Sequence, residues 1–202
     1  MKTGSVRLRA VLFDMDGTII DVPYDWAEIK RDLQTNGRPI LSHLSSLEEP
    51  ERTRKWRRLE EYEEKATAQA KLMAGVPELL DFLSRQNIKT ALVTNNSGTN
   101  TDRLLHRFDL GFDLVLTREE GLWKPSAGPF LEVMRRLEIG ASECCAVGDS
   151  RFDLLAAEAA GISRVFLVSA APEEFRDSGA VLCRTIGEVH SHLIDILTCG
   201  RT

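Results

Sequence analysis

The chain has 202 residues and a net charge of −5, and 43% of its residues are hydrophobic against 28% charged. This balance is ordinary for a folded globular protein, and the length suits one domain with a small insertion. The net negative charge argues against nucleic acid or a membrane surface as a general partner.

The first ten residues, MKTGSVRLRA, lack the long apolar core of a signal peptide, and no apolar run approaches the length of a transmembrane helix. The cysteines have no metal-ligand spacing and are expected to be buried, reduced thiols: Cys144, Cys145, Cys183 and Cys199. We therefore expect a cytoplasmic protein.

Short apolar runs alternate with helical patterns along most of the chain. Buried strands are predicted by RAVLFD, KTALVTN, FDLVLT, CCAVGD and SRVFLV, at residues 9–14, 89–95, 112–117, 144–149 and 163–168, with a further strand at 180–185. Helices are predicted at residues 76–87, 101–108, 128–138, 151–161 and 186–197. This alternation predicts an α/β fold, a Rossmann-like three-layer sandwich around a mainly parallel sheet.

Residues 22–74 break the alternation because they carry no strand signal. Within them, DWAEIKRDL predicts a helix that Asp25 and Glu28 begin as a capping box, and residues 51–73 predict one long helix. We interpret residues 22–74 as an inserted α-helical cap domain on a core domain made of residues 1–21 and 75–202.

Polar side chains stand where the predicted strands end, and ligands of open parallel sheets bind beyond the carboxyl ends of the strands. The residues concerned are Asp14, Asp16, Thr94, Asn95, Lys124, Asp149 and Asp153. Such an acidic cluster is electrostatically poor without a cation, and carboxylate oxygens suit Mg²⁺. A nucleophilic carboxylate, a metal ion and a lysine describe phosphoryl transfer through an aspartyl-phosphate.

The order and spacing of these residues resemble the haloacid-dehalogenase-like hydrolase superfamily, most closely its phosphoglycolate-phosphatase-like branch. DMDGT at residues 14–18 resembles the first motif and VTNNS, with Thr94, the second. KP, with Lys124, resembles the third motif, and GDSRFD, with Asp149 and Asp153, the fourth. The helical insertion lies where the family places a cap.

This resemblance implies a role for each residue. Asp14 would attack phosphorus, Asp16 would act as general acid and then base, and Thr94 and Lys124 would contact the phosphoryl group. Gly17, Thr18 and Asn95 are assigned to substrate binding. Mg²⁺ would be held by Asp14, the main-chain carbonyl of Asp16, and Asp149, with Asp153 orienting a bound water or Lys124.

The expected function is that of a Mg²⁺-dependent phosphatase acting on a small monoester, either phosphoglycolate or a sugar phosphate. Two alternatives stay open at this point: a sugar-phosphate mutase on the same scaffold, and a non-catalytic regulatory protein that binds a phosphorylated ligand. The partner is a small phosphorylated metabolite, and the chain is a monomer or a homodimer. Whether Arg38 or the basic run between Arg52 and Arg58 contacts the substrate is also open.

Overall fold

The computed structural model describes the backbone of residues 7–199 and all their side chains except those of residues 172, 173 and 199. Six parallel strands form one sheet in the order β5-β4-β1-β6-β7-β8. Their bounds are β1 (Ala10–Phe13), β4 (Lys89–Val93), β5 (Leu114–Leu116), β6 (Cys144–Gly148), β7 (Val165–Val168) and β8 (Val181–Cys183).

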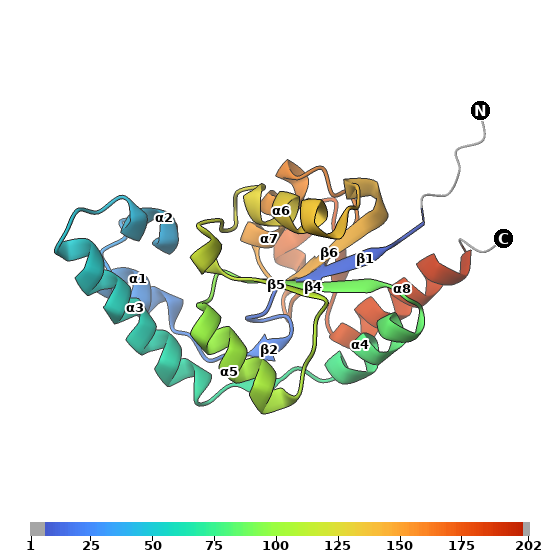
Figure 1. The fold of residues 1–202 in the computed structure, drawn as a ribbon, viewed down its shortest axis with the longest axis horizontal. Helices are drawn as coiled ribbons and strands as arrows, with labels where there is room; N and C mark the ends of the chain where they lie inside the picture. The colour runs from blue at the N-terminus through green and yellow to red at the C-terminus, as the bar shows by residue number, and fades with distance from the viewer. Residues whose placement is uncertain (1–6, 200–202) are drawn as a thin grey trace.

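Helices cover both faces of this sheet, as Figure 1 shows. One face carries α4 (Val76–Arg85), α5 (Gly98–Phe108) and α8 (Ile186–Cys199), and the other carries α6 (Gly128–Leu137) and α7 (Arg151–Ala159). Single turns of 3-10 helix lie at η1 (Arg118–Glu120), η2 (Ala141–Glu143) and η3 (Pro172–Phe175). The predicted three-layer sandwich around a parallel sheet is confirmed.

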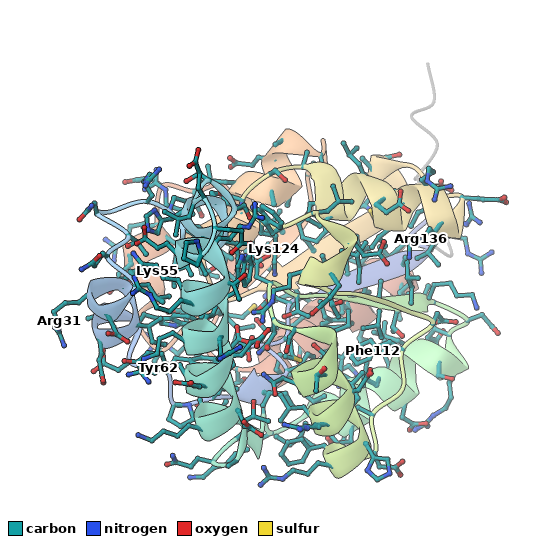
Figure 2. The ribbon with its side chains drawn as sticks, turned by 60° about the vertical axis from the view of Figure 1, so that its left-hand side comes forward. Arg31, Lys55, Tyr62, Phe112, Lys124 and Arg136 are labelled. Atoms are coloured by element: carbon teal, nitrogen blue, oxygen red, sulfur yellow. The ribbon has the colours of Figure 1, made fainter. Side chains whose placement is uncertain are left out.

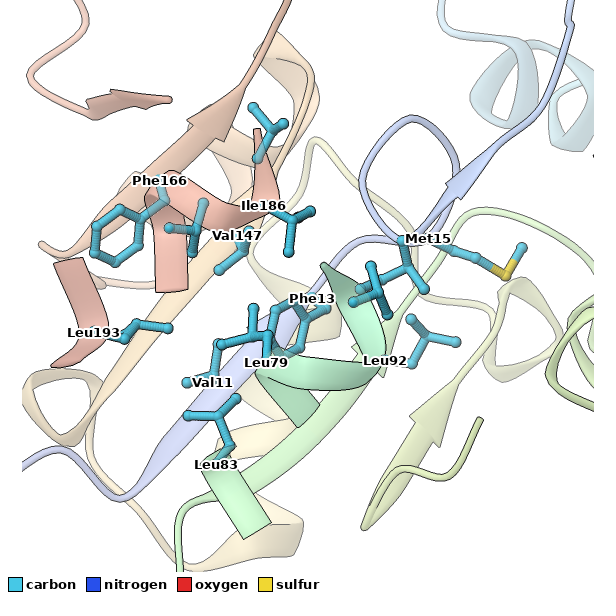
Figure 3. Close-up of a cluster of buried hydrophobic side chains, with 14 of the residues drawn as sticks. Val11, Phe13, Met15, Leu79, Leu83, Leu92, Val147, Phe166, Ile186 and Leu193 are labelled. Atoms are coloured by element: carbon cyan, nitrogen blue, oxygen red, sulfur yellow. The ribbon is translucent and has the colours of Figure 1, made fainter. Parts of the chain in front are cut away.

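Alternation along each strand divides the core between the two faces. Val11 and Phe13 of β1 pack against α4 and α8 (Figure 3). Leu12 of the same strand packs with residues of α6 and α7. Cys144 and Cys145 divide in the same way, and both are buried free thiols, as is Cys183. The thiol of Cys199 lies outside the described side chains.

The segment between residues 22 and 70 holds three helices, α1 (Trp26–Asp32), α2 (Ile40–Ser45) and α3 (Glu51–Thr67), which lie to one side of the sheet (Figure 1). They share an apolar cluster of their own, formed by Ile29, Leu33, Leu41, Leu44 and Leu59. Asp25 begins α1 as predicted, because its carboxylate accepts a hydrogen bond of 2.8 Å from the Glu28 N–H. The other half of the predicted capping box is not formed, and Glu28 Oε1 instead accepts from the Tyr62 hydroxyl at 3.3 Å.

Two details of this segment differ from the sequence-based expectation. A two-residue strand, β3 (Lys71–Leu72), pairs antiparallel with β2 (Ile20–Asp21), although no strand was expected between residues 22 and 74. The long helix ends at Thr67 instead of reaching residue 73, because the chain turns back there toward β2. Two residues carry no periodic signal, so only the pairing partner identifies this strand.

Leu79 offers a test of the core on the α4 face, because its side chain is fully buried between α4 and the sheet. We expect Leu79→Ala to lower the free energy of unfolding by about 2–5 kcal/mol, since it leaves a cavity in a packed core. Urea denaturation measures this value. The control is Leu131→Ala on α6, where the side chain is 50% exposed and a change within about 0.5 kcal/mol is expected. Equal losses in the two variants would contradict this packing.

Candidate active site

Three adjacent strands bring the predicted site residues to the carboxyl edge of the sheet. β1 lies between β4 and β6, and these strands are followed by Asp14, Thr94 and Asp149 respectively. The Asp14 N–H continues the ladder by donating to the Val147 carbonyl at 2.8 Å. The sheet order therefore converts positions up to 135 residues apart, Asp14 and Asp149, into neighbours.

Lys124 is the cation of this cluster, and its side chain is only 3% exposed. Its ammonium group forms ion pairs with Asp14 Oδ1 and with Asp153 Oδ1, the second at 2.6 Å. Asn95 holds the Lys124 backbone from both sides: its Nδ2 donates to the carbonyl and its Oδ1 accepts from the N–H, each at 2.9 Å. The Asn95 side chain is thus occupied in fixing the loop that carries the lysine.

Asp153 accepts hydrogen bonds from two neighbouring residues, Ser150 and Lys124. Its Oδ2 accepts from the Ser150 N–H at 3.1 Å and from the Ser150 hydroxyl at 2.5 Å in the capping box that begins α7. Its Oδ1 accepts a hydrogen bond from the Lys124 ammonium group. A Cβ atom at Gly148 would lie 2.4 Å from the Asp153 Cβ, so glycine at this position allows the close approach.

Asp16 is held by a residue that the sequence analysis did not select. Asn96 Nδ2 donates to Asp16 Oδ2 at 3.1 Å and also lies 3.0 Å from the Tyr24 hydroxyl, which precedes α1. Thr94, expected to contact phosphate, accepts the Asn96 N–H on its Oγ1 at 3.0 Å. The strand end after β4 is therefore a short network that orients Asp16.

Gly17 and Thr18 lie behind the site and not on its wall. Gly17 has φ +84°, and a Cβ there would stand 2.1 Å from Asp149 Oδ2. Its N–H donates to the Ile20 carbonyl at 2.7 Å, which closes the turn after Asp16. Thr18 is fully buried. Neither residue, nor Thr94, is among those that line the cavity described next, so their assigned contacts with substrate stay predictions.

A cavity of about 460 Å³ lies between this sheet edge and the three helices. Figure 2 shows Lys124 on the side of the core next to α3, where Lys55 and Tyr62 are labelled. From the sheet side, the cavity is lined by Asp14, Asp16, Asn95, Asn96, Lys124, Asp149 and Asp153. From the helical side, it is lined by Tyr24, Trp26, Lys30, Arg38, Leu59 and Glu63, among others.

The cavity distinguishes between the two arginine candidates for substrate contact. Arg38 lines it, whereas none of the basic residues between Arg52 and Arg58 does. Arg58 pairs with Asp32 at 2.6 Å and Arg52 with Glu49 at 2.9 Å, and the buried Lys55 ammonium donates to the Leu33 carbonyl at 2.8 Å. Arg52, Lys55 and Arg58 are therefore engaged within the helical segment.

Burial and mutual repulsion control the charges at the sheet edge. Burial raises the pKa of Asp14 and of Asp16 to about 7, while burial together with the charges of Asp14 and Asp153 raises the pKa of Asp149 to about 8. Burial alone would lower the pKa of Lys124, but its ion pairs with Asp14 and Asp153 raise it above its usual range. One lysine thus leaves this group of acids with excess negative charge.

The donor set fits a hard divalent cation. Carboxylate oxygens of Asp14, Asp149 and Asp153 lie within 4.8 Å of one another. Asp153 already accepts from Lys124 and Ser150, so Asp14 and Asp149 are the carboxylates best placed to share a cation such as Mg²⁺. These two belong to the ligand set expected from the sequence, and a bound cation would hold both ionised.

A second buried ion pair joins the helical segment to the core near Asp16. Glu63 of α3 pairs with Arg118 of η1, and both side chains are buried. The Arg118 guanidinium lies 5.1 Å from the centre of the Trp56 ring. Arg118 directly follows the predicted strand at residues 112–117, but neither it nor Glu63 was selected as a site residue. The burial of Arg118 depends on Glu63, which is far away in the sequence.

Fold and site together define an α/β protein with an acidic, lysine-containing pocket at the carboxyl edge of a parallel sheet. Comparison with known families identifies it further: residues 23–167 match the model of the haloacid dehalogenase-like hydrolases. The chain belongs to this family and is an enzyme of the hydrolase class.

Relatives agree with this assignment. A haloacid dehalogenase-like hydrolase domain-containing protein of Arabidopsis thaliana is 30% identical, covering 86% of this chain and 77% of the relative. A phosphoglycolate phosphatase of Pseudomonas fluorescens is 31% identical, covering 79% of this chain and 69% of the relative. The crystal structure of a hydrolase from Pseudomonas syringae shares the fold, with a TM-score of 0.77 at 22% identity and coverage of 94% and 99%.

Within residues 7–199, no helix combines the length and the apolar character that spanning a membrane requires.

Gly17 provides a test of the cation site. We expect Gly17→Ala to weaken Mg²⁺ binding at least about tenfold, because the added methyl group occupies the place of the Asp149 carboxylate. Isothermal titration calorimetry measures the affinity. Gly179→Ala is the matched control, since Gly179 has a similar φ of +74° but open space around it. If both variants bound Mg²⁺ like the unmodified protein, the close approach of Asp149 to Gly17 would not matter for the site.

Proposed function

We propose that this hydrolase is a Mg²⁺-dependent phosphatase that cleaves a small phosphate monoester, of the phosphoglycolate or sugar-phosphate type, through an aspartyl-phosphate on Asp14. The observation that carries the proposal is the convergence of Asp14, Asp16, Lys124 and Asp149 on the wall of one cavity. A nucleophile, a second acid, an ammonium group and a pair of metal-binding carboxylates are the components that phosphoryl transfer requires.

Asp14 and Asp16 would have different roles in the reaction, Asp14 as the nucleophile and Asp16 as the general acid and base. A carboxylate oxygen of Asp14 attacks phosphorus, and the bond between phosphorus and the leaving oxygen breaks. Asp16 gives its proton to that oxygen, so the alcohol leaves neutral. Asp16 then takes a proton from water, which attacks the phosphorus of the aspartyl-phosphate and releases inorganic phosphate with Asp14 restored. The pKa of Asp16, which burial raises to about 7, supports an acid that can both give and take a proton.

Other residues would hold the phosphate in place. Lys124, which Asp153 and Asn95 fix, puts a positive charge beside Asp14, and Thr94 donates its hydroxyl to a phosphoryl oxygen. Gly17, Thr18 and Asn95 would contribute to substrate binding, Gly17 and Asn95 by shaping the loops around the phosphate. Asp14, the Asp16 carbonyl and Asp149 would hold Mg²⁺, with Asp153 as a supporting residue. When bound, Mg²⁺ supplies the positive charge that neutralises the phosphate oxygens.

Residues 22–74 would act as a cap over a core made of residues 1–21 and 75–202. The helices of this segment have their own apolar cluster and form one side of the cavity, which supports a separate body that covers the substrate. Two chain crossings connect it to the core, next to the β2–β3 pair. Closure of such a cap excludes bulk water from the reaction.

The name of the Pseudomonas fluorescens relative, a phosphoglycolate phosphatase, supports a small phosphorylated metabolite as substrate. The fold does not separate a phosphatase from the mutase alternative, which would return the phosphoryl group to the sugar instead of to water, because a putative beta-phosphoglucomutase from Thermotoga maritima has the same fold, with a TM-score of 0.72 at 24% identity. Family membership argues against a non-catalytic regulatory role. A cytoplasmic location, a monomeric or homodimeric state and the lack of nucleic-acid or membrane partners stay predictions.

Release of inorganic phosphate tests the proposal. With Mg²⁺ present, we expect turnover of at least one member of a panel of small monoesters, and loss of it with EDTA or in Asp14→Asn, which lacks the nucleophilic carboxylate. Asp81→Asn is the control, because Asp81 is an exposed residue of α4. A folded, Mg²⁺-binding protein that releases no phosphate would contradict the proposal, and conversion of one sugar phosphate into its isomer would identify a mutase.

A further inference from the structure

Glu63 is a buried carboxylate that the proposed reaction does not use. It lies on α3, is only 5% exposed, and lines the same cavity as Asp14 and Asp16. Its Oε1 pairs with Arg118. Its Oε2 is buried and has no hydrogen-bond partner among the residues that the structure describes. A buried acceptor without a donor is uncommon in folded proteins and calls for an explanation.

The Glu63–Arg118 pair presents its negative end to the cavity. Arg118 is not among the residues that line the cavity, and its guanidinium lies over the Trp56 ring on the other side of the pair. The Arg118 backbone N–H donates to the Asn96 carbonyl at 3.3 Å, and Asn96 Nδ2 donates to Asp16 Oδ2 at 3.1 Å, so Glu63 is linked to Asp16 through Arg118 and Asn96. Glu63 therefore lies on the Asp16 side of the cavity.

Basic residues also line the cavity, but they belong to its solvent-exposed part. Lys30, Arg38 and Arg151 are all exposed, and Arg38 Nη2 lies 2.5 Å from His43 Nδ1. The buried charges of the cavity other than Lys124 are carboxylates, including Asp14 and Glu63. Among the cavity-lining residues that the structure describes, no buried cation other than Lys124 is therefore available to a second anionic group.

We propose that Glu63 is a specificity-determining residue that selects a neutral, hydroxyl-bearing leaving alcohol, such as a polyol or sugar, and rejects one with a carboxylate beside the ester carbon, as in phosphoglycolate. The inference rests on the proposed function, in which Asp16 protonates the leaving oxygen and so locates the alcohol next to Glu63.

Two physical effects favour a neutral, hydroxyl-bearing leaving alcohol over one that carries a carboxylate. A carboxylate on the leaving group would lie nearer to Glu63, which lines the cavity, than to its partner Arg118, which does not, so repulsion by Glu63 would exceed attraction by Arg118. A hydroxyl group can donate a hydrogen bond to a carboxylate oxygen, which would supply the donor that Oε2 lacks. A site built for a hydroxyl group discriminates against analogues that cannot donate.

Two pairs of monoesters that differ only at the group next to the ester carbon test the proposal. The first pair is 2-hydroxyethyl phosphate and 2-phosphoglycolate, and the second is glycerol 2-phosphate and 2-phosphoglycerate. We expect the unmodified enzyme, with Mg²⁺, to favour the neutral member of each pair at least about tenfold in kcat/KM. A ratio at or below one would overturn the proposal.

The variant Glu63→Gln keeps the size of the side chain and removes its charge. We expect the ratio within each pair to fall about tenfold, through a lower KM for the acidic member. Glu60→Gln is the matched control: Glu60 is on the same helix, exposed and 4.0 Å from Arg118, but it does not line the cavity, so the ratio should not change. If Glu63 had a purely structural role, Glu63→Gln would lower kcat/KM equally for both monoesters of a pair. The ratio would then be unchanged, which would overturn the proposal.

Unpaired Arg118 could prevent Glu63→Gln from folding. The double variant Glu63→Gln with Arg118→Gln removes both charges together and carries the same expectation. The Asp14→Asn variant allows the same comparison without turnover. Calorimetry measures its affinity for each monoester of a pair, and the ratio of the two affinities should also favour the neutral one. If no monoester released phosphate, the proposed phosphatase function would be wrong. The affinities would still show whether Glu63 discriminates between the neutral and the acidic monoester. If phosphoglycolate bound as tightly as 2-hydroxyethyl phosphate, only the inference about Glu63 would fail.

Discussion

Carboxylates can be buried together at a strand end only if a cation compensates them, and in this protein Lys124 supplies that cation from within the chain. Its ammonium group bridges Asp14 and Asp153, and all three side chains are buried. Removing a charge from such a cluster leaves its partner unpaired in a medium of low dielectric, which is strongly destabilising. The excess negative charge that Lys124 leaves is what makes the site suited to a divalent cation.

Much of the surrounding structure serves to keep Lys124 in this position. Asn95 bonds the lysine backbone from both sides, so the end of β4 fixes a loop that begins beyond β5. Asp153 joins the lysine to the first turn of α7, and Gly148 leaves room for it. Rigid strands and a helix terminus thus determine the geometry of the charges, which is how a reactive site is preorganised.

The helical segment is linked to this site by polar contacts as well as by apolar ones. Tyr24, just before α1, shares Asn96 with Asp16, and Glu63 of α3 pairs with Arg118 beside the sheet. Any movement of this helical segment would therefore change the surroundings of Asp16 directly. Coupling of this kind would connect the proposed closure over a substrate with the environment of the residue proposed to move the proton.

The sequence by itself determined the alternation of strands and helices and the acidic strand ends, because hydrophobic periodicity and the residues that follow each strand are local properties. It therefore predicted the parallel sheet and brought Asp14, Lys124 and Asp149 to one edge. The β2–β3 pair, the exclusion of the basic run from the cavity, and the Glu63–Arg118 pair were decided only by the tertiary structure. Glu63 and Arg118 are 55 positions apart, and a charged residue on a helix shows no local sign of being buried until a partner far along the chain is placed against it.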